Sequence, residues 1–265
     1  MRKNLKVFWF HFKGHLQRTF EYRLSLVLWI LNGFIGPFMA LAVWVTVSKE
    51  GNLPLSGSEL VTYFLSTILV IRLTQSWSLE SIGRRIKSGA FSQYLLRPSP
   101  YFLNDLANNL STKLFRLLTL LPFFWLFFLI FRLQIEIELF KERFFLFLLA
   151  SILGFLINYF FQNAIALLAF WTTEIRGIYH LFEMILGFFG GSVIPIVMMP
   201  HSLKNLMIVL PFRFLISFPI ETFLGNLQTD IRVGFLIGLG WLVFSLAIWW
   251  ILFKKGIKKY SAVEA

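Results

Sequence analysis

The sequence has no cysteine and few charged residues. With no Cys among its 265 residues, disulfide frameworks and thiolate metal sites are excluded. Charged residues make up only 14% of the chain, whereas soluble domains carry about 25%. The hydrophobic share is 57% and the mean hydropathy is +0.73, which excludes intrinsic disorder. These numbers predict an integral membrane protein, because the polar residues are too few to cover a soluble fold.

Nucleotide-binding and catalytic motifs are also absent. The sequence has no G-x-x-x-x-G-K-[ST] phosphate loop, no His-Glu-x-x-His and no Gly-x-Ser-x-Gly. A proton-coupled carrier usually has carboxylates within its spans, and Glu183 is the only candidate here. We therefore expect no catalytic residues, no metal and no cofactor in this chain. Any energy for transport would come from another protein.

Six apolar stretches are long enough to cross a hydrocarbon core of roughly 30 Å, which takes ~20 helical residues. They lie at 24–47, 60–79, 110–131, 144–171, 178–199 and 232–253. The fold class is predicted to be an all-α integral membrane protein, with a six-helix domain at 24–253 and a basic tail at 254–265. Most of the 25 Lys and Arg residues fall on the side of the two termini. The positive-inside rule therefore predicts a multi-pass protein of the cell (plasma or inner) membrane with both termini in the cytoplasm.

Residues 1–23 read as a basic amphipathic helix in the membrane interface. Its apolar residues fall on one arc at helical spacing: Leu5, Phe8, Trp9, Phe12, Leu16 and Phe20. Such a helix turns its Lys and Arg toward lipid phosphates, so we expect membrane lipid as a partner and assign the net charge of +12 to lipid and cytoplasmic loops rather than nucleic acid. The helix is either a simple anchor or also contacts a cytoplasmic partner. His11 and His15 are four residues apart, but without a carboxylate nearby we interpret them as interfacial residues rather than metal ligands.

The longest loop on the predicted cytoplasmic side covers 80–106. We expect a short helix at 82–96, because Pro98 and Pro100 prevent it from continuing. Exposed apolar residues on such an element need a cover of lipid or protein: Ile86, Phe91, Leu95 and Leu96. The segment is therefore either a lipid-facing loop or a docking surface.

The region 190–226 is apolar but interrupted by glycines and prolines: Gly190, Gly191, Pro195, Pro200, Pro211 and Pro219. The pieces between them are too short to span a bilayer. Broken helices are tolerated at membrane depth where they pack in protein or line a cavity. We predict two short re-entrant helices on the outer side, with a kinked helix followed by an interfacial loop as the alternative.

Among the polar residues of the predicted spans, five are candidates for intramembrane pairing or for a pathway: Arg72, Asn158, Gln162, Asn163 and Glu183. An intramembrane charge should face the bundle and find a partner. We predict that Arg72 pairs with Glu183, with Glu80 or a lipid phosphate as alternatives. The three amides lie close together on one span and either form helix–helix hydrogen bonds or line a pathway.

Two local patterns point to a known family. One is Ile86-Lys87-Ser88-Gly89 followed by Leu95-Leu96-Arg97-Pro98, and the other is the glycine and proline series from Gly190-Gly191 to Pro219, ending at Leu224-Gly225. With these patterns the chain resembles the ABC-2 type (type V) transporter permeases, closest to the subgroup called ABC-2 family transporter protein. The resemblance implies an exporter permease that works by alternating access with a second permease, identical or a sister. It also implies a partner ABC ATPase in the cytoplasm, which binds ATP and Mg.

The resemblance also implies roles for the segments. The loop at 82–98 would be the coupling helix that receives the ATPase motion, through Ile86, Gly89, Leu95, Leu96, Arg97 and Pro98. The N-terminal helix would be a connecting helix, and the re-entrant helices an outer gate at the dimer interface. The 33 Phe residues suit a lipid-like or hydrophobic substrate and equally suit a lipid-facing surface. Three other functions stay open: an ATP-independent channel or lipid scramblase, a membrane-embedded enzyme acting on lipids, and a non-catalytic assembly subunit.

Overall fold

The described chain is helical from end to end. The computed structural model describes residues 2–21, 23–51, 53–97, 99–131, 137–172, 175–225 and 227–260, and describes the backbone alone at 2–3, 23–32, 50, 124, 126–131 and 137–142. Its long helices are α2 (Arg23–Glu50), α3 (Gly57–Thr74), α6 (Tyr101–Phe131), α7 (Ile137–Ala166) and α12 (Ile231–Lys259). The remaining helices are α1 (Arg2–Glu21), α4 (Ser78–Lys87), α5 (Ser92–Leu95), α8 (Ile175–Phe189), α9 (His201–Val209), α10 (Pro211–Leu215) and α11 (Ser217–Leu224), with 3-10 turns η1 (Leu167–Phe170) and η2 (Ile196–Met198). No strand occurs in these ranges, so the predicted all-α class is confirmed.

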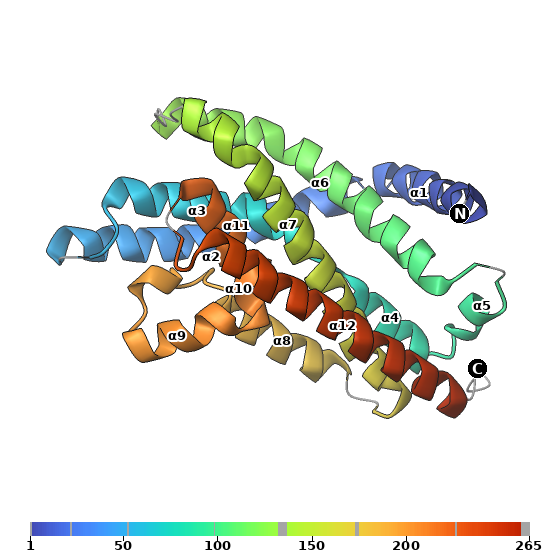
Figure 1. The fold of residues 1–265 in the computed structure, drawn as a ribbon. Helices are drawn as coiled ribbons and strands as arrows, with labels where there is room; N and C mark the ends of the chain where they lie inside the picture. Colours follow the sequence, from blue (N-terminus) through green and yellow to red (C-terminus); the bar gives the residue numbers. More distant parts are fainter. Residues whose placement is uncertain are drawn as a thin grey trace.

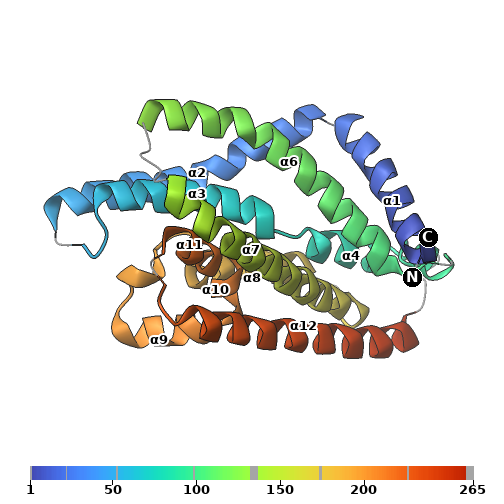
Figure 2. The same cartoon turned by 45° about the horizontal axis from the view of Figure 1, so that its top comes forward.

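Helix α7 occupies the centre of the bundle (Figure 1). It packs against α12, α11, α4, α10 and α3, while α1 lies along α6 and α2 along α3. Both labelled chain ends lie at the same end of the molecule (Figure 2), beside α5 and the last turns of α12. We call this the terminal end. The opposite end carries α9 and the connection between α2 and α3.

Three helical stretches are long and apolar enough to cross a membrane, judged by length and composition. They are Gly57–Lys87, Arg143–Phe170 and Ile231–Lys259, and a shorter apolar helix covers Gly33–Lys49. This search covered the described residues alone, and parts of the predicted spans at 24–47 and 110–131 have only their backbone described. Helix α12 continues beyond the predicted end of the last span at 253, so the predicted tail at 254–265 is helical as far as Lys259.

The predicted end of the span at 178–199 is wrong. Helix α8 stops at Phe189, and Gly190 closes its last turn with a hydrogen bond from its N–H to the Leu186 carbonyl (2.8 Å). Gly191 then adopts a φ of +86°, a backbone conformation that L side chains rarely adopt. A 15-residue helix is about 22 Å long, which is shorter than a hydrocarbon core. The chain between α8 and α12 is a series of short helices.

Glycines allow close approach at the helix crossings of the core. A side chain at Gly154 of α7 would collide with the Phe214 backbone of α10, and one at Gly238 of α12 with Leu153 of α7. Small residues at such crossings let backbones pack tightly, as in membrane helix pairs. The centre of the bundle is therefore fixed by contacts between α7, α10 and α12.

Candidate functional site

The predicted coupling segment is two helices rather than one. The expected helix at 82–96 is interrupted after Lys87, because Gly89 has a φ of +75° and reverses the chain before α5 begins at Ser92. Helix α4 buries one face, with Leu79 and Ile82 almost fully enclosed, and Gly83 fits tightly against Ile175 of α8. The α4–α5 segment is therefore attached firmly to the bundle.

A tyrosine at the end of α12 holds the turn between α4 and α5. The Tyr260 hydroxyl donates a hydrogen bond to the Gly89 carbonyl (2.6 Å) and accepts one from the Ser92 N–H (3.2 Å). Phe91, which is fully buried, packs its ring at 5.2 Å from Tyr101 and 6.0 Å from Tyr260. The turn is thus connected to both α6 and α12.

The predicted docking residues divide into a buried and an exposed set. Ile86 is 5% exposed, so it packs in the core, while Leu95 is 39% and Leu96 86% exposed. Arg97 is exposed and lies over the Tyr94 ring at 5.2 Å, and Pro98 lies outside the described residues. Of the predicted docking residues, Leu95, Leu96 and Arg97 are therefore the exposed ones.

Polar side chains surround the break between α3 and α4. Lys113 of α6 donates from Nζ to the carbonyl oxygens of Arg72 (3.2 Å), Leu73 (2.6 Å) and Gln75 (2.9 Å). The last carbonyls of a helix have no intrahelical partner, and a lysine there satisfies them and complements the helix dipole. Lys113 was not among the predicted site residues, because no local pattern in the sequence indicates this role.

Helix α4 begins beside a buried carboxylate. Ser78 donates from Oγ to Asp105 Oδ2 (2.5 Å), Ser81 to Asp105 Oδ1 (3.2 Å), and Asn109 Nδ2 to the Ser78 hydroxyl (3.2 Å). A carboxylate at a helix N-terminus is favoured by the helix dipole. Together with Lys113, Asp105 fixes the position of the α3–α4 break on α6.

The predicted intramembrane amides join α7 to the same break. Asn158 donates to the Thr74 carbonyl (3.0 Å), Gln162 donates to Asn158 Oδ1 (3.1 Å), and Asn163 accepts from the Tyr101 hydroxyl (3.4 Å). All three amides are buried. Their hydrogen bonds are made to protein groups on α3, α4, α6 and α7.

The predicted pair of Arg72 with Glu183 is not found. Among the described residues no ion pair joins them, and the Arg72 guanidinium lies against Gly33 of α2 while Glu183 is on α8. The reason is that Arg72 points from α3 toward α2 and not toward Glu183.

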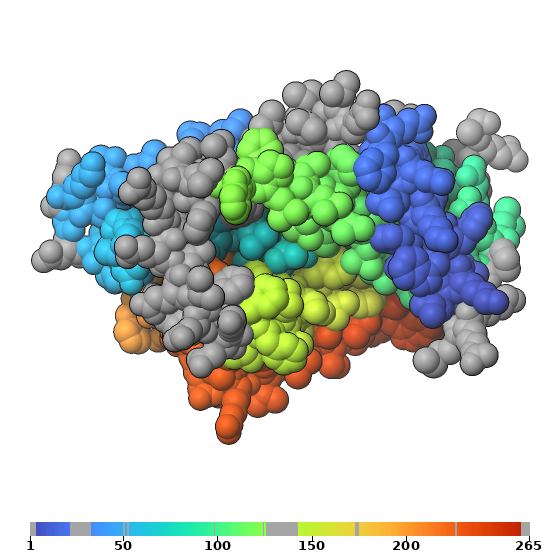
Figure 3. Space-filling model, turned by 90° about the horizontal axis from the view of Figure 1, so that it is seen from above, coloured from blue at the N-terminus to red at the C-terminus, as the bar shows by residue number. Residues whose placement is uncertain are grey.

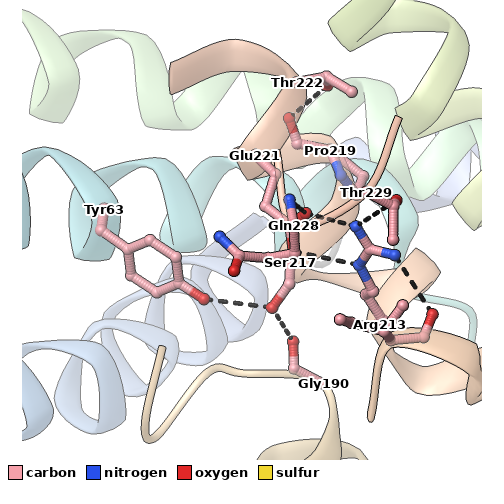
Figure 4. Close-up of polar contacts among 10 residues, drawn as sticks. Tyr63, Gly190, Arg213, Ser217, Pro219, Glu221, Thr222, Gln228 and Thr229 are labelled. Atoms are coloured by element: carbon pink, nitrogen blue, oxygen red, sulfur yellow. Dashed lines mark hydrogen bonds and ion pairs between the residues drawn. The ribbon is translucent and has the colours of Figure 1, made fainter. Parts of the chain in front are cut away.

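A different buried ion pair lies in the broken-helix region (190–225). Arg213 of α10 contacts Glu221 of α11 at 2.6 Å between Nη2 and Oε2, and its Nε donates to Oε1 (3.2 Å) (Figure 4). The same guanidinium donates to Thr229 (3.2 Å) and to the Ile208 carbonyl (3.2 Å). The side chains are 0% and 6% exposed. The signal for this pair was present in the sequence as two opposite charges in an apolar segment, but neither residue was among the predicted intramembrane charges.

Tyr63 ties the broken-helix region to α3. Its hydroxyl donates to the Gly191 carbonyl (2.8 Å) and lies 3.2 Å from the Ser217 hydroxyl, which donates to the Gly190 carbonyl (2.7 Å) (Figure 4). The predicted gate glycines therefore form the turn that Tyr63 and Ser217 hold. The predicted prolines begin the short helices: Pro195 precedes η2, Pro200 precedes α9, Pro211 starts α10 and Pro219 lies in the first turn of α11.

The long apolar helices define a helical membrane protein. The chain belongs to the family described as ABC-2 family transporter protein, whose model matches residues 56–263. The match covers the coupling segment, the break and the broken-helix region. No curated protein and no solved structure matches the chain.

Proposed function

We propose that this chain is the permease subunit of an ATP-binding-cassette exporter driven by a separate ATPase subunit. The observation that carries the proposal is the exposed Leu95–Leu96 pair on a segment anchored to the bundle, in an ABC-2 family chain without a nucleotide-binding motif. ATP and Mg would be bound by the partner. A second permease, identical or a sister, would complete the pathway.

The contacts support a route for motion between the two ends. A push on α5 reaches α4 through the Gly89 turn, and α4 leads directly through the break at 75–77 into α3. Helix α3 is tied to the broken-helix region by Tyr63 near one end and by the Thr74 hydroxyl, which donates to the Leu215 carbonyl (2.6 Å), at the other. Helices α3 and α4 would therefore transmit ATPase closure to the predicted gate and shift the bundle between two states.

The proposed topology has six spans with the terminal end in the cytoplasm. Helix α8 is too short to cross alone, so the short helices that follow it would complete that crossing as a re-entrant region on the outer side. The substrate would pass between two permeases. It would be a lipid-like or another hydrophobic compound, and its identity is open.

The test combines co-purification with a matched pair of variants. An ATPase subunit should co-purify with the tagged chain from its native host. The Leu95→Asp/Leu96→Asp variant should stay in the membrane. It should no longer stimulate ATP hydrolysis by the ATPase subunit and should no longer transport. Ser88→Asp/Gln93→Asp adds the same charge to exposed positions of the same segment and should retain both. Unchanged transport in the leucine variant would contradict the docking role.

The rival function is an ATP-independent lipid scramblase. The purified chain is placed in vesicles of dioleoylphosphatidylcholine without ATP. A fluorescent lipid analogue should then exchange between the two leaflets at its background rate. Rapid exchange by the chain alone would favour the scramblase over the permease.

A further inference from the structure

A basic groove opens at the terminal end between α1, the α4–α5 segment and the start of α6. Its volume is about 610 Å³. The groove contains four permanent cations and two histidines: Lys13, Arg18, Arg85, Arg97, His11 and His15. No Asp or Glu lines it within the described part of the chain. Figure 3 shows α1 on the outside of the bundle beside the blue-green atoms of the α4–α5 segment.

The cations of this groove lack acidic partners. Neither ion pair of the described chain includes Lys13, Arg18, Arg85 or Arg97, and the pair formed by Arg84 with Glu80 (3.4 Å) belongs to other residues of α4. Arg85 and Arg97 are instead oriented by the Tyr94 ring, at 4.8 and 5.2 Å from its centroid. Like charges gathered around one space repel each other, and an anion between them removes that repulsion. Guanidinium groups match phosphate oxygens with two parallel hydrogen bonds.

Exposed apolar side chains accompany the groove on the same helix. Phe10, which lines the groove, is 77% exposed, and Leu5 and Trp9 are 59% and 50% exposed. A helix with Lys and Arg on one side and exposed Trp, Phe and Leu on another lies at the boundary between lipid headgroups and acyl chains. The groove would then open at the depth of the phosphates.

We propose that the groove binds the phosphate of an anionic membrane lipid, with Arg18, Arg85 and Arg97 as the phosphate ligands and the acyl chains beside Phe10. An acidic segment of a partner protein would match the charge of the groove but would not cover the exposed apolar side chains. A lipid matches both features. Because Arg85 and Arg97 belong to the α4–α5 segment, the lipid also connects α1 to that segment. Its effect on coupling rests on the proposed function, whereas its binding does not.

The test measures lipid retention by the purified full-length chain alone. Native mass spectrometry would count the dioleoylphosphatidylglycerol molecules that remain bound after detergent removal, with dioleoylphosphatidylcholine as the neutral comparison. Arg18→Gln/Arg85→Gln should lower phosphatidylglycerol retention about tenfold. Arg84→Gln/Lys87→Gln changes the net charge equally at exposed positions outside the groove, and its retention should stay within about twofold of the unmodified chain. Arg97→Gln, at an exposed residue, gives a third variant if the double variant fails to fold.

Three outcomes would overturn the proposal. Equal loss in both double variants would mean that diffuse charge, not the groove, holds the lipid. Full displacement by inorganic phosphate or glycerol phosphate at the same concentration would assign the groove to a soluble anion. Unchanged lipid retention, combined with loss of a co-purifying ATPase, would make the groove a protein contact. Because retention needs no ATPase, a missing ATPase partner would contradict the proposed function and leave this result intact.

Discussion

The two ends of the molecule use arginine in opposite ways. In the broken-helix region, Arg213 is fully buried and its guanidinium is bonded to Glu221, Thr229 and a carbonyl. At the terminal end, Arg85 and Arg97 face an open groove and lie over the Tyr94 ring, and neither forms an ion pair with a described Asp or Glu. A guanidinium whose donors are used within the chain is a structural element. One whose donors face an open space is available for a ligand.

The difference follows from the cost of desolvation. A buried charge is tolerated only with a close opposite charge and further hydrogen bonds, and both are present around Arg213. The arginines of the groove keep contact with water, so they need no partner to remain charged. The comparison predicts that charge removal has a large effect on stability at one end and a small one at the other.

The largest effect is expected from breaking the buried pair. Glu221→Ala leaves Arg213 buried and unpaired, and should lower the free energy of unfolding by about 3–5 kcal/mol. The double variant Arg213→Met/Glu221→Leu, which replaces both charges by apolar groups, should recover most of that loss. Unfolding by SDS titration in mixed micelles would measure both.

The matching change at the terminal end is Arg85→Gln. It should alter the free energy of unfolding by no more than about 0.5 kcal/mol, as for other surface substitutions. A loss at Arg85 as large as that at Glu221 would remove the distinction between the two ends. If Arg213→Met/Glu221→Leu were as unstable as Glu221→Ala, the ion pair itself would carry the stability, and the loss in Glu221→Ala would not come from the unpaired charge.

A pair of glycine substitutions should change stability in opposite directions. Gly191→Ala forces a side chain into a φ of +86° and toward the Ser217 hydroxyl, and the left-handed conformation alone costs about 1–2 kcal/mol. Gly14→Ala on α1 meets nothing within 4 Å and should stabilise the helix by about 0.5–1 kcal/mol. Melting temperatures of the two variants would check the signs. An unchanged melting temperature for Gly191→Ala would mean that the turn adapts.

Removing one hydroxyl at each end gives a smaller contrast. Tyr63→Phe loses a buried hydrogen bond to the Gly191 carbonyl and should cost about 1–2 kcal/mol, because the carbonyl stays buried. Tyr260→Phe loses the partly buried bond to the Gly89 carbonyl and should cost about 0.5–1 kcal/mol. SDS titration of both variants would measure the difference, and equal costs would indicate equal solvation of the two carbonyls.

The hydropathy of the sequence and its helical spacing predict much of this fold. The all-α class and the amphipathic first helix follow from composition and helical spacing. The end of α8 at Phe189 does not, because the apolar pattern continues to 199 while the backbone turns at Gly191. The periodicity of apolar residues indicates which residues avoid water. It does not indicate where a continuous apolar segment changes direction.

Charge pairing was the least predictable feature of the site. Arg72 and Glu183 were paired because both fall in apolar spans, yet the pair that forms joins Arg213 and Glu221. Eight residues separate that pair along the chain, and only the fold of α10 against α11 brings them together. Tyr260 contacts Gly89 from 171 residues away, which no local pattern can indicate.

The smallest predicted effect concerns the histidines of the groove. Burial lowers the pKa of His11, with His15 and Arg97 adding to the shift. Burial also lowers the pKa of His15, opposed by its hydrogen bond to Asn104 (2.8 Å) and by Asp105, and reinforced by Arg18 and Arg85. A histidine whose pKa is lower in the packed state binds fewer protons there than after release. Packing of α1 on α6 should therefore be complete above the usual histidine pKa of about 6.5 and weaken as the pH falls below it.

Hydrogen exchange of the α1 amides would measure that weakening. Between pH 7.5 and 5.5, and after correction for intrinsic rates, exchange in α1 should accelerate while exchange in α12 stays constant. A bound phosphate favours the charged imidazole, so phosphatidylglycerol should reduce the acceleration if the groove holds it beside His11 and His15. Acceleration of the same size with and without that lipid would place the phosphate away from the histidines, and thus away from the groove.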